Sequence, residues 1–451
     1  MKQDIPTKED LITYMESGFR TKNNYKVGIE FEVFLYNKSN YQPVEYQGNI
    51  PNIQDLLKSY NPEFWQTEYD NNYLVGLHSK IGNITLEPAG QLEFSSIPFT
   101  NVKDIAVANT KFFKETLSIL KKQNIGMYPL GLNPKHQLDE LPLMPKARYN
   151  FMDKYMSQVG SMGKNMMRQT CTVQTNLDYS SNSDLAKKFR VGMALAPIIS
   201  AMYANSPLHN GKNTNYLSYR NKIWQNTDPS RAGFLQSAFT DGFTLEKYVD
   251  YALNVPMYFL YRNKEYIKIP HITFGEYLSG NKKIANFTPN QDDFITHLST
   301  LFPHVRLKTY MEIRYPDCVD TPYLESLPAL FVGLLYHDAS LENIYNLVKN
   351  WSFQEVVKLQ NEVIKHGLAV KFKGSTVQNI ALQILNIAEM GLKARGLQEE
   401  VYLYPLIELI KSGKTLAEEK LNLLASYGNN INKFIDEISI NEVKSLYINK
   451  K

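Results

Sequence analysis

The stretch VGIEFEVFLYN (Val27–Asn37) combines strong β-strand formers with two glutamates spaced two residues apart. Successive side chains of a strand point to opposite faces of its sheet. Glu30 and Glu32 therefore share one face, while Ile29 and Phe31 share the other. The stretch predicts a strand that buries an apolar face and carries two carboxylates on its polar face.

The same alternation recurs in three later stretches: LEPAGQLEFSS (Leu86–Ser96), MRQTCTVQTNLDYS (Met167–Ser180) and VRLKTYMEIRYPD (Val305–Asp317). Each stretch predicts a strand with one apolar and one polar face. The polar faces, together with the Pro-Ala-Gly bend before the first strand, collect acidic, amide and arginine side chains: Glu87, Glu93, Arg168, Gln174, Asn176, Glu312 and Arg314.

A polar strand face has an ordinary explanation, because one side of an antiparallel sheet often meets water. Four strands rich in carboxylate and amide oxygens are harder to explain in this way, since crowded oxygens repel one another unless a cation lies among them. The set contains no His or Cys, which favours Mg2+ or Mn2+ over zinc. Arginines on the same faces can bind polyphosphate. The pattern therefore predicts a site for a metal ion and ATP.

Composition excludes several other classes of protein. The chain has 451 residues, 43% of them apolar and 21% charged, with a formal net charge of +4, which gives no reason to expect nucleic acid or a membrane as a partner. Two cysteines exclude a disulfide scaffold and a four-cysteine zinc site. The N-terminus lacks the basic and then apolar layout of a secretion signal. We expect a reduced, cytoplasmic protein.

The distribution of elements predicts an α+β protein. Strand patterns mix with helical ones up to about residue 328, and later segments repeat apolar residues at three- and four-residue spacing. We expect a catalytic body over residues 1–328 and a helical portion over residues 329–451 that packs on it.

The middle segment YLSYRNKIWQNTDPSRAGF (Tyr216–Phe234) places two arginines close to a tryptophan. Guanidinium groups bind carboxylates through two parallel hydrogen bonds, and an indole ring shields such a pair from water. Arg220, Trp224 and Arg231 are therefore candidates to bind an amino-acid carboxylate. The alternative is a surface loop held by ion pairs.

At these residues the sequence resembles the plant and proteobacterial type of glutamate–cysteine ligase. The matching stretches run in the family's order from about residue 25 to residue 335, and they include the four strands and the arginine segment. The resemblance implies the fold of glutamine synthetase catalytic domains, in which a curved antiparallel sheet forms a funnel flanked by helices. It also implies that ATP and Mg2+ bind at one end of the funnel and glutamate at the other.

The resemblance further implies a role for each candidate residue. Metal ligation falls to Glu30, Glu32, Glu87, Glu93 and Glu312, and nucleotide binding falls to Gln174, Asn176 and Arg314. Glutamate binding falls to Arg168, Arg220, Trp224 and Arg231. We expect Arg314, next to Glu312 on the same face, to stabilise the phosphoryl group during transfer.

The implied reaction is the ATP-dependent ligation of L-glutamate, through its γ-carboxylate, to L-cysteine by way of γ-glutamyl phosphate, the first step of glutathione biosynthesis. Two alternatives remain at this point. One is a related ligase that uses a different amine, and the other is a catalytically silent nucleotide-binding protein. Phosphate release with cysteine, with other amines and with none distinguishes the three.

Overall fold

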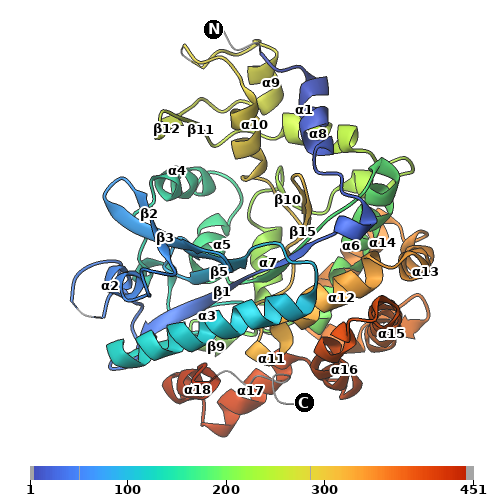
Figure 1. Ribbon diagram of the computed structural model, residues 1–451. Helices are drawn as coiled ribbons and strands as arrows, with labels where there is room; N and C mark the ends of the chain where they lie inside the picture. The colour runs from blue at the N-terminus through green and yellow to red at the C-terminus, as the bar shows by residue number, and fades with distance from the viewer. Residues whose placement is uncertain (1–4, 50, 285, 443–451) are drawn as a thin grey trace.

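A computed structural model describes residues 5–49, 51–284 and 286–442. Within these residues, nine strands form one antiparallel sheet in the order β14-β15-β7-β1-β5-β4-β3-β2, and β6 pairs with the far end of β1 (Figure 1). The strands of the sheet are β1 (Val27–Asn37), β2 (Gln66–Asp70), β3 (Tyr73–Ser79), β4 (Gly82–Leu86), β5 (Leu92–Ser96), β6 (Ile125–Tyr128), β7 (Val173–Leu177), β14 (Val305–Leu307) and β15 (Met311–Ile313). The predicted α+β class with a central antiparallel sheet is confirmed.

The register of the sheet brings the predicted polar residues onto neighbouring strands. Glu32 of β1 lies directly opposite Glu93 of β5, and Glu30 lies opposite Gln174 of β7. Residues opposite each other in an antiparallel pair have Cβ atoms about 4.5–5.5 Å apart. The polar faces predicted for the separate strands therefore form one continuous polar surface across the sheet.

The opposite face of the sheet is apolar and is covered by the long helix α3 (Val102–Gln123), which lies across β1 in Figure 1. Phe31 of β1 stacks on Phe113 of this helix, with ring centroids 5.2 Å apart, and Phe94 of β5 stacks on Phe112 at 4.7 Å. Burying one such side chain contributes about 1.5–3 kcal/mol. This packing orients the strands, so that their carboxylates must face away from α3.

Two of the predicted strands differ in the structure. Residues 305–313 form a hairpin of β14 and β15 instead of one strand, and Arg306 lies opposite Glu312 across it. Residues 163–169 form helix α5 (Gly163–Gln169), so Arg168 belongs to a helix and not to the strand that follows. In both places the period-2 alternation of the sequence extends beyond the strand. The prediction was wrong there because alternation alone does not show where a strand stops.

The C-terminal helices share one apolar core with the body. Helix α12 (Ser326–Leu335) packs on β7 and on α15 (Val377–Arg395), and it spans the predicted boundary between residues 328 and 329. The division into two portions stays a prediction. The remaining C-terminal helices are α13 (Asp338–Val348), α14 (Phe353–His366), α16 (Tyr404–Lys411), α17 (Leu416–Ser426) and α18 (Ile431–Ile438), with short strands β16 (Lys371–Phe372) and β17 (Ser375–Thr376).

The remaining elements form a lobe and surround the sheet. A lobe at the top of Figure 1 contains α1 (Lys8–Glu16), α8 (Leu245–Asn254), α9 (Phe274–Leu278), α10 (Gln291–Leu298) and the hairpin of β11 (Phe259–Arg262) and β12 (Glu265–Lys268). Around the sheet lie α2 (Ile53–Lys58), α4 (Ala147–Met156), α6 (Asn182–Met202), α7 (Tyr219–Gln225), α11 (Thr321–Leu324) and the short strands β8 (Leu208–His209), β9 (Lys212–Asn213), β10 (Ala232–Gly233) and β13 (Phe302–Pro303).

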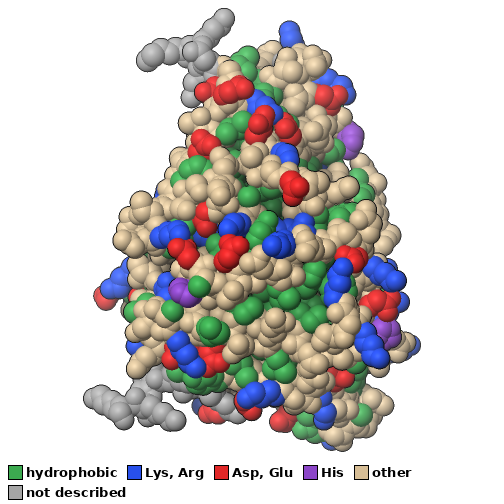
Figure 2. Space-filling view, turned by 90° about the vertical axis from the view of Figure 1, so that its right-hand side faces the viewer, with side chains coloured by type: hydrophobic (Ala, Val, Ile, Leu, Met, Phe, Trp, Pro, Cys, Tyr) green, Lys and Arg blue, Asp and Glu red, His purple; other side chains and the backbone are tan. Residues whose placement is uncertain are grey.

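The surface mixes charges of both signs. Figure 2 shows basic and acidic side chains interspersed over the face that it presents. Among the helices of the described residues, none combines the length and the apolarity that crossing a membrane requires.

Candidate active site

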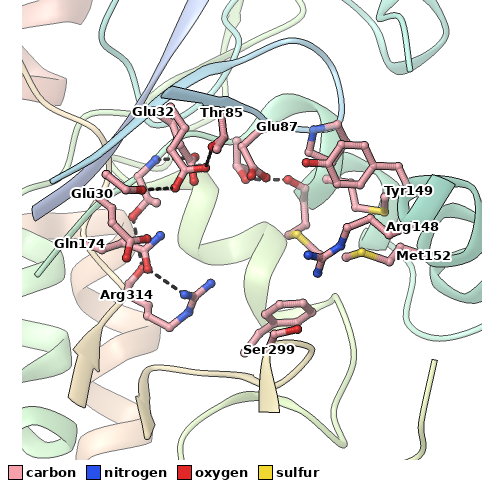
Figure 3. Close-up of a pocket in the computed structure, with 18 of the residues that line it drawn as sticks. Glu30, Glu32, Thr85, Glu87, Arg148, Tyr149, Met152, Gln174, Ser299 and Arg314 are labelled. Atoms are coloured by element: carbon pink, nitrogen blue, oxygen red, sulfur yellow. Dashed lines mark hydrogen bonds between the residues drawn. The ribbon is translucent and has the colours of Figure 1, made fainter. Parts of the chain in front are cut away.

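A cavity of about 460 Å³ lies on the polar face of the sheet, and helices α4, α5 and α7 contribute its other walls (Figure 3). The structure brings four predicted glutamates together there: Glu30 and Glu32 from β1, Glu93 from β5, and Glu87 from the bend after β4. Glu68 of β2, which the sequence analysis did not select, also lines the cavity. One wall of the cavity is therefore acidic.

These carboxylates are hydrogen-bonded but close to one another. The Asn176 amide donates to Glu30 Oε1 (2.7 Å), and the backbone N–H of Thr172 donates to Glu32 Oε2 (3.0 Å). Burial raises the pKa of the Glu30, Glu32 and Glu93 carboxyl groups, and repulsion between neighbouring carboxylates raises these pKa values further. A cation that enters the cavity relieves this repulsion.

The glutamates face a set of basic side chains. Five carboxylates line the cavity, and the six cations that line it with them are Lys146, Arg148, Arg220, Arg306, Lys308 and Arg314. Figure 3 shows Glu30, Gln174 and Arg314 on one side of the open space and Arg148 and Met152 on the other. The cavity can therefore hold a ligand that carries several negative charges together with a metal ion.

Glu312 has different surroundings from the other glutamates. Its carboxylate is fully buried, contacts the Arg306 guanidinium, and lies 3.0 Å from Lys308 Nζ and 3.4 Å from an Arg314 nitrogen. Burial alone raises the pKa of the Glu312 carboxyl, but these three cations hold the pKa well below its usual range. The structure does not place Glu312 in the cavity wall, so its predicted metal ligation needs at least one of these cations to move.

Arg314 and Gln174, both predicted to bind nucleotide, meet at the cavity. Arg314 donates to Gln174 Oε1 at 2.7 Å, and both side chains line the cavity. This hydrogen bond orients the guanidinium and leaves its other donors for phosphate oxygens. Asn176 does not line the cavity, and it acts on the site through its hydrogen bond to Glu30.

The predicted carboxylate-binding segment divides in the structure. Arg220 and Trp224 of α7 line the cavity. Arg220 donates to the backbone carbonyls of Arg314 and Tyr315, each at 3.1 Å, while its Nε and the Trp224 Nε1 are buried donors without a hydrogen-bond partner. Buried donors in native proteins are nearly always satisfied. The two free donors therefore indicate a place for a ligand's oxygen atoms.

Arg231 does not line the cavity, and its predicted role in glutamate binding stays a prediction. Its guanidinium donates to Asp228 (2.6 Å), to the backbone carbonyls of Thr300 (3.1 Å) and Pro256 (2.7 Å), and to the Tyr155 hydroxyl (3.0 Å). All three nitrogen atoms are thus engaged, and the side chain is buried. Arg231 connects segments distant in sequence and has no donor free for a substrate carboxylate.

Arg168 is also outside the cavity wall. From helix α5 it forms an ion pair with Asp153 of α4, and Lys164 Nζ lies 3.0 Å from the same carboxylate. The residue that was expected on the strand face therefore joins two helices.

The strand patterns of the sequence did not predict the wall that α4 contributes. Lys146 Nζ and the Tyr149 hydroxyl both donate to the backbone carbonyl of Leu86, at 2.8 and 2.6 Å. Arg148 lines the same wall, and its Nε is buried without a partner. These residues do not follow a strand pattern in the sequence. An arginine beside a proline-rich loop is the one feature of the sequence that points to this wall.

Divalent metal binding was tested against the donor set. In the part of the chain that the structure describes, no three carboxylate, imidazole or thiol groups converge closely enough to hold an ion by themselves. Mg2+ in nucleotide sites, however, is usually bound by one or two carboxylates, with waters and phosphates as the other ligands. Asn176 Oδ1, next to Glu30, is a buried acceptor without a partner. The oxygen-only set therefore fits a Mg2+ ion that binds together with ATP.

The antiparallel sheet and its cavity of opposed carboxylates and basic side chains define a protein that can bind a polyanionic ligand together with a cation. Residues 26–445 match the family model described as glutamate-cysteine ligase family 2 (GCS2). The chain belongs to this family, which confirms the predicted resemblance and the predicted class of enzyme, a ligase that forms a C–N bond.

Relatives and solved structures agree with this assignment. The chain is 38% identical to the chloroplastic glutamate–cysteine ligase of Medicago truncatula (92% of this chain, 82% of the relative) and 40% identical to the chloroplastic glutamate–cysteine ligase B of Oryza sativa subsp. japonica (92% and 84%). The crystal structure of glutamate–cysteine ligase from Francisella tularensis in complex with AMP has a TM-score of 0.56 at 14% identity, covering 93% of this chain and 88% of that one. At that identity the likeness supports the fold alone.

Proposed function

We propose that this protein uses ATP to join the γ-carboxylate of L-glutamate to the amine of L-cysteine, the first step of glutathione biosynthesis. The observation that carries the proposal is a single cavity, in a chain of this family, in which an acidic wall faces six basic side chains. The relatives named glutamate–cysteine ligase match more than nine-tenths of the chain, which supports this substrate pair.

The reaction proceeds in two displacements. An oxygen of the glutamate γ-carboxylate attacks the γ-phosphorus of ATP, ADP leaves, and γ-glutamyl phosphate forms. The neutral amine of cysteine then attacks the acyl carbon, and the carbon–oxygen bond to phosphate breaks as the amide bond forms. Inorganic phosphate leaves with the electron pair of that bond and takes up the proton that the amine loses. Both steps need positioning and charge stabilisation, and neither needs a nucleophile from the protein.

Arg314 serves the phosphate end of the cavity. Its guanidinium is fixed by Gln174, so that it can stabilise the negative charge of the transferring phosphoryl group. Glu30, Glu32, Glu87 and Glu93 are the residues that would hold Mg2+ or Mn2+, together with Glu312 once one of its cations has moved. Such an ion offsets the charge of the β- and γ-phosphates when bound.

Arg148 and Arg220 serve the amino-acid end. Each has a buried Nε without a partner, and each lines the cavity. A guanidinium in this state is suited to a carboxylate, which it binds through two parallel hydrogen bonds. We assign to these two arginines the α-carboxylates of the two amino-acid substrates.

A phosphate-release assay tests the proposal. Purified protein with ATP, Mg2+, glutamate and cysteine should release phosphate and form γ-glutamylcysteine, identified by mass. Omission of either amino acid should reduce the release to background. Equal release with an unrelated amine in place of cysteine would assign a different acceptor, and no release with any amine would reject the ligase function.

The cellular location is a separate question. The relatives described above are chloroplastic enzymes, so they do not support the predicted cytoplasmic location. We retain the cytoplasm as a proposal because the protein has two cysteines, both free and buried. Fractionation of the source cells, with detection of the protein by antibody, tests it.

A further inference from the structure

Of the three cations around Glu312, Lys308 is the one held least firmly. The Arg306 guanidinium contacts Glu312 and also donates to two backbone carbonyls, at 3.1 and 3.2 Å. The Arg314 guanidinium donates to an amide oxygen at 2.7 Å. Apart from Glu312, the Lys308 ammonium contacts the Tyr310 hydroxyl at 3.3 Å. A lysine ammonium is a compact charge on a flexible stem, so Lys308 can move while the two arginines stay.

The Lys308 ammonium lies where two carboxylates need a positive charge. It is 3.0 Å from Glu312 Oε1, and the charge of Glu30 also acts on it. Lys308 belongs to the turn between β14 and β15 and lines the cavity. The Lys308 ammonium group therefore extends from the β14–β15 turn to the cavity, next to the acidic wall.

The same place offers ligands for a divalent cation. Glu312 Oε1 lies within ion-pair distance of Lys308 but has no partner with hydrogen-bond geometry. Asn176, which lies opposite Glu312 in the sheet, has a buried Oδ1 without a partner and donates its amide hydrogen to Glu30. Carboxylate and amide oxygens around one position are the ligand types that Mg2+ and Mn2+ take.

The cavity is close to electrical balance without any added ion. Its wall carries five glutamates and six cations, and Glu312 behind the wall supplies a sixth carboxylate. Buried charges are stable when they are paired, so an added divalent cation beside Glu312 must compete with a cation already present. Lys308 is that cation, because apart from Glu312 its ammonium has one hydrogen-bond contact, the Tyr310 hydroxyl at 3.3 Å.

We propose that Lys308 stands in for a divalent cation in the ligand-free protein. Its ammonium neutralises Glu312 and Glu30, and Mg2+ or Mn2+ that binds together with ATP displaces it. The inference rests on the proposed function, from which it takes the metal and the nucleotide. It follows that metal binds weakly by itself and more tightly with ATP, whose phosphates accept the displaced ammonium. Lys308 thereby couples the two binding events.

The test compares Lys308→Met with the wild-type protein and with Lys308→Arg, which keeps the charge. Mn2+ binding is measured by electron paramagnetic resonance without nucleotide, and again with a non-hydrolysable ATP analogue. Removal of a positive charge next to the ion should make Mn2+ bind to Lys308→Met about tenfold more tightly without nucleotide. The gain in Mn2+ affinity on adding the analogue should shrink in this variant, and Lys308→Arg should behave like the wild type.

The inference is overturned if Lys308→Met, without nucleotide, binds Mn2+ no more tightly than the wild type does. It is also overturned if Lys308→Arg shows the same change in Mn2+ affinity as Lys308→Met. Thermal melts confirm that each variant is folded, and Lys308→Gln replaces Lys308→Met if the latter does not fold. Phosphate release by the wild type with glutamate and cysteine is measured on the same preparation. Its absence refutes the proposed function, whereas the metal comparison decides the role of Lys308.

Discussion

Arg231 and Arg148 form a matched pair of substitutions, because the Arg231 guanidinium is engaged within the protein and Arg148 lines the cavity. Arg231→Met removes a buried guanidinium 2.6 Å from Asp228 and leaves that carboxylate without its cation. Breaking a buried ion pair at one partner costs about 3–5 kcal/mol. We expect the free energy of unfolding to fall by about that amount, while the KM for either amino acid stays close to the wild-type value.

Arg148→Met should show the reverse. Arg148 has no ion pair among the contacts that the structure describes, so its loss should change the free energy of unfolding by no more than about 0.5 kcal/mol. Its proposed partner is a substrate carboxylate, and hydrogen bonds to a charged group contribute about 1.5–3 kcal/mol. The KM for glutamate or cysteine should therefore rise by about tenfold to a hundredfold or more.

Thermal melts and steady-state kinetics measure both effects. Kinetics are recorded at a temperature at which Arg231→Met is folded, and the KM for ATP serves as an internal control. Asp228→Asn combined with Arg231→Met should recover part of the lost stability, because the unpaired charge is gone. An Arg231→Met variant with wild-type melting and a raised KM for an amino acid would refute the structural role. An unchanged KM in Arg148→Met would refute its assignment as a carboxylate ligand.

Three further predictions concern other parts of the molecule. Burial raises the pKa of Asp293 to about 6, against the opposing charge of Arg262. The folded state then holds the proton more tightly, so stability should fall by about 1–2 kcal/mol, discounted for solvent screening, as pH rises from 4 to 6, and Asp293→Asn should flatten this dependence in melts. Gly333→Ala should destabilise the protein by about 1–3 kcal/mol, since the new Cβ would lie 2.3 Å from the Ala388 carbonyl oxygen of α15. Denaturant titration measures this loss, and an unfolding midpoint equal to that of the wild type would contradict the close approach. Glu32→Gln keeps an acceptor for the Thr172 N–H but loses a charge. Mg-ATP should therefore raise the melting temperature of this variant less than that of the wild type. An undiminished rise in melting temperature would exclude Glu32 from the metal site.

The strands and their acidic face followed from the sequence. Alternation with period two assigns side chains to faces without knowledge of the rest of the fold, because the geometry of a strand is local. Glu30, Glu32 and Glu93 were placed on one surface in this way, and the sheet register confirmed that they are neighbours. Apolar residues at three- and four-residue spacing likewise predicted helices after residue 328, where α13 to α18 lie.

Only the tertiary structure decided which cations face the carboxylates. Arg231 and Arg220 belong to one short segment and looked equivalent, yet contacts with residues distant in sequence, such as Thr300 and Tyr155, engage Arg231 fully, while Arg220 keeps a free donor. Helix α4, which brings Arg148 to the cavity, reaches the polar face through long-range packing. The chemistry of a side chain is encoded at its own position, but its availability to a ligand depends on partners that folding brings from elsewhere in the chain.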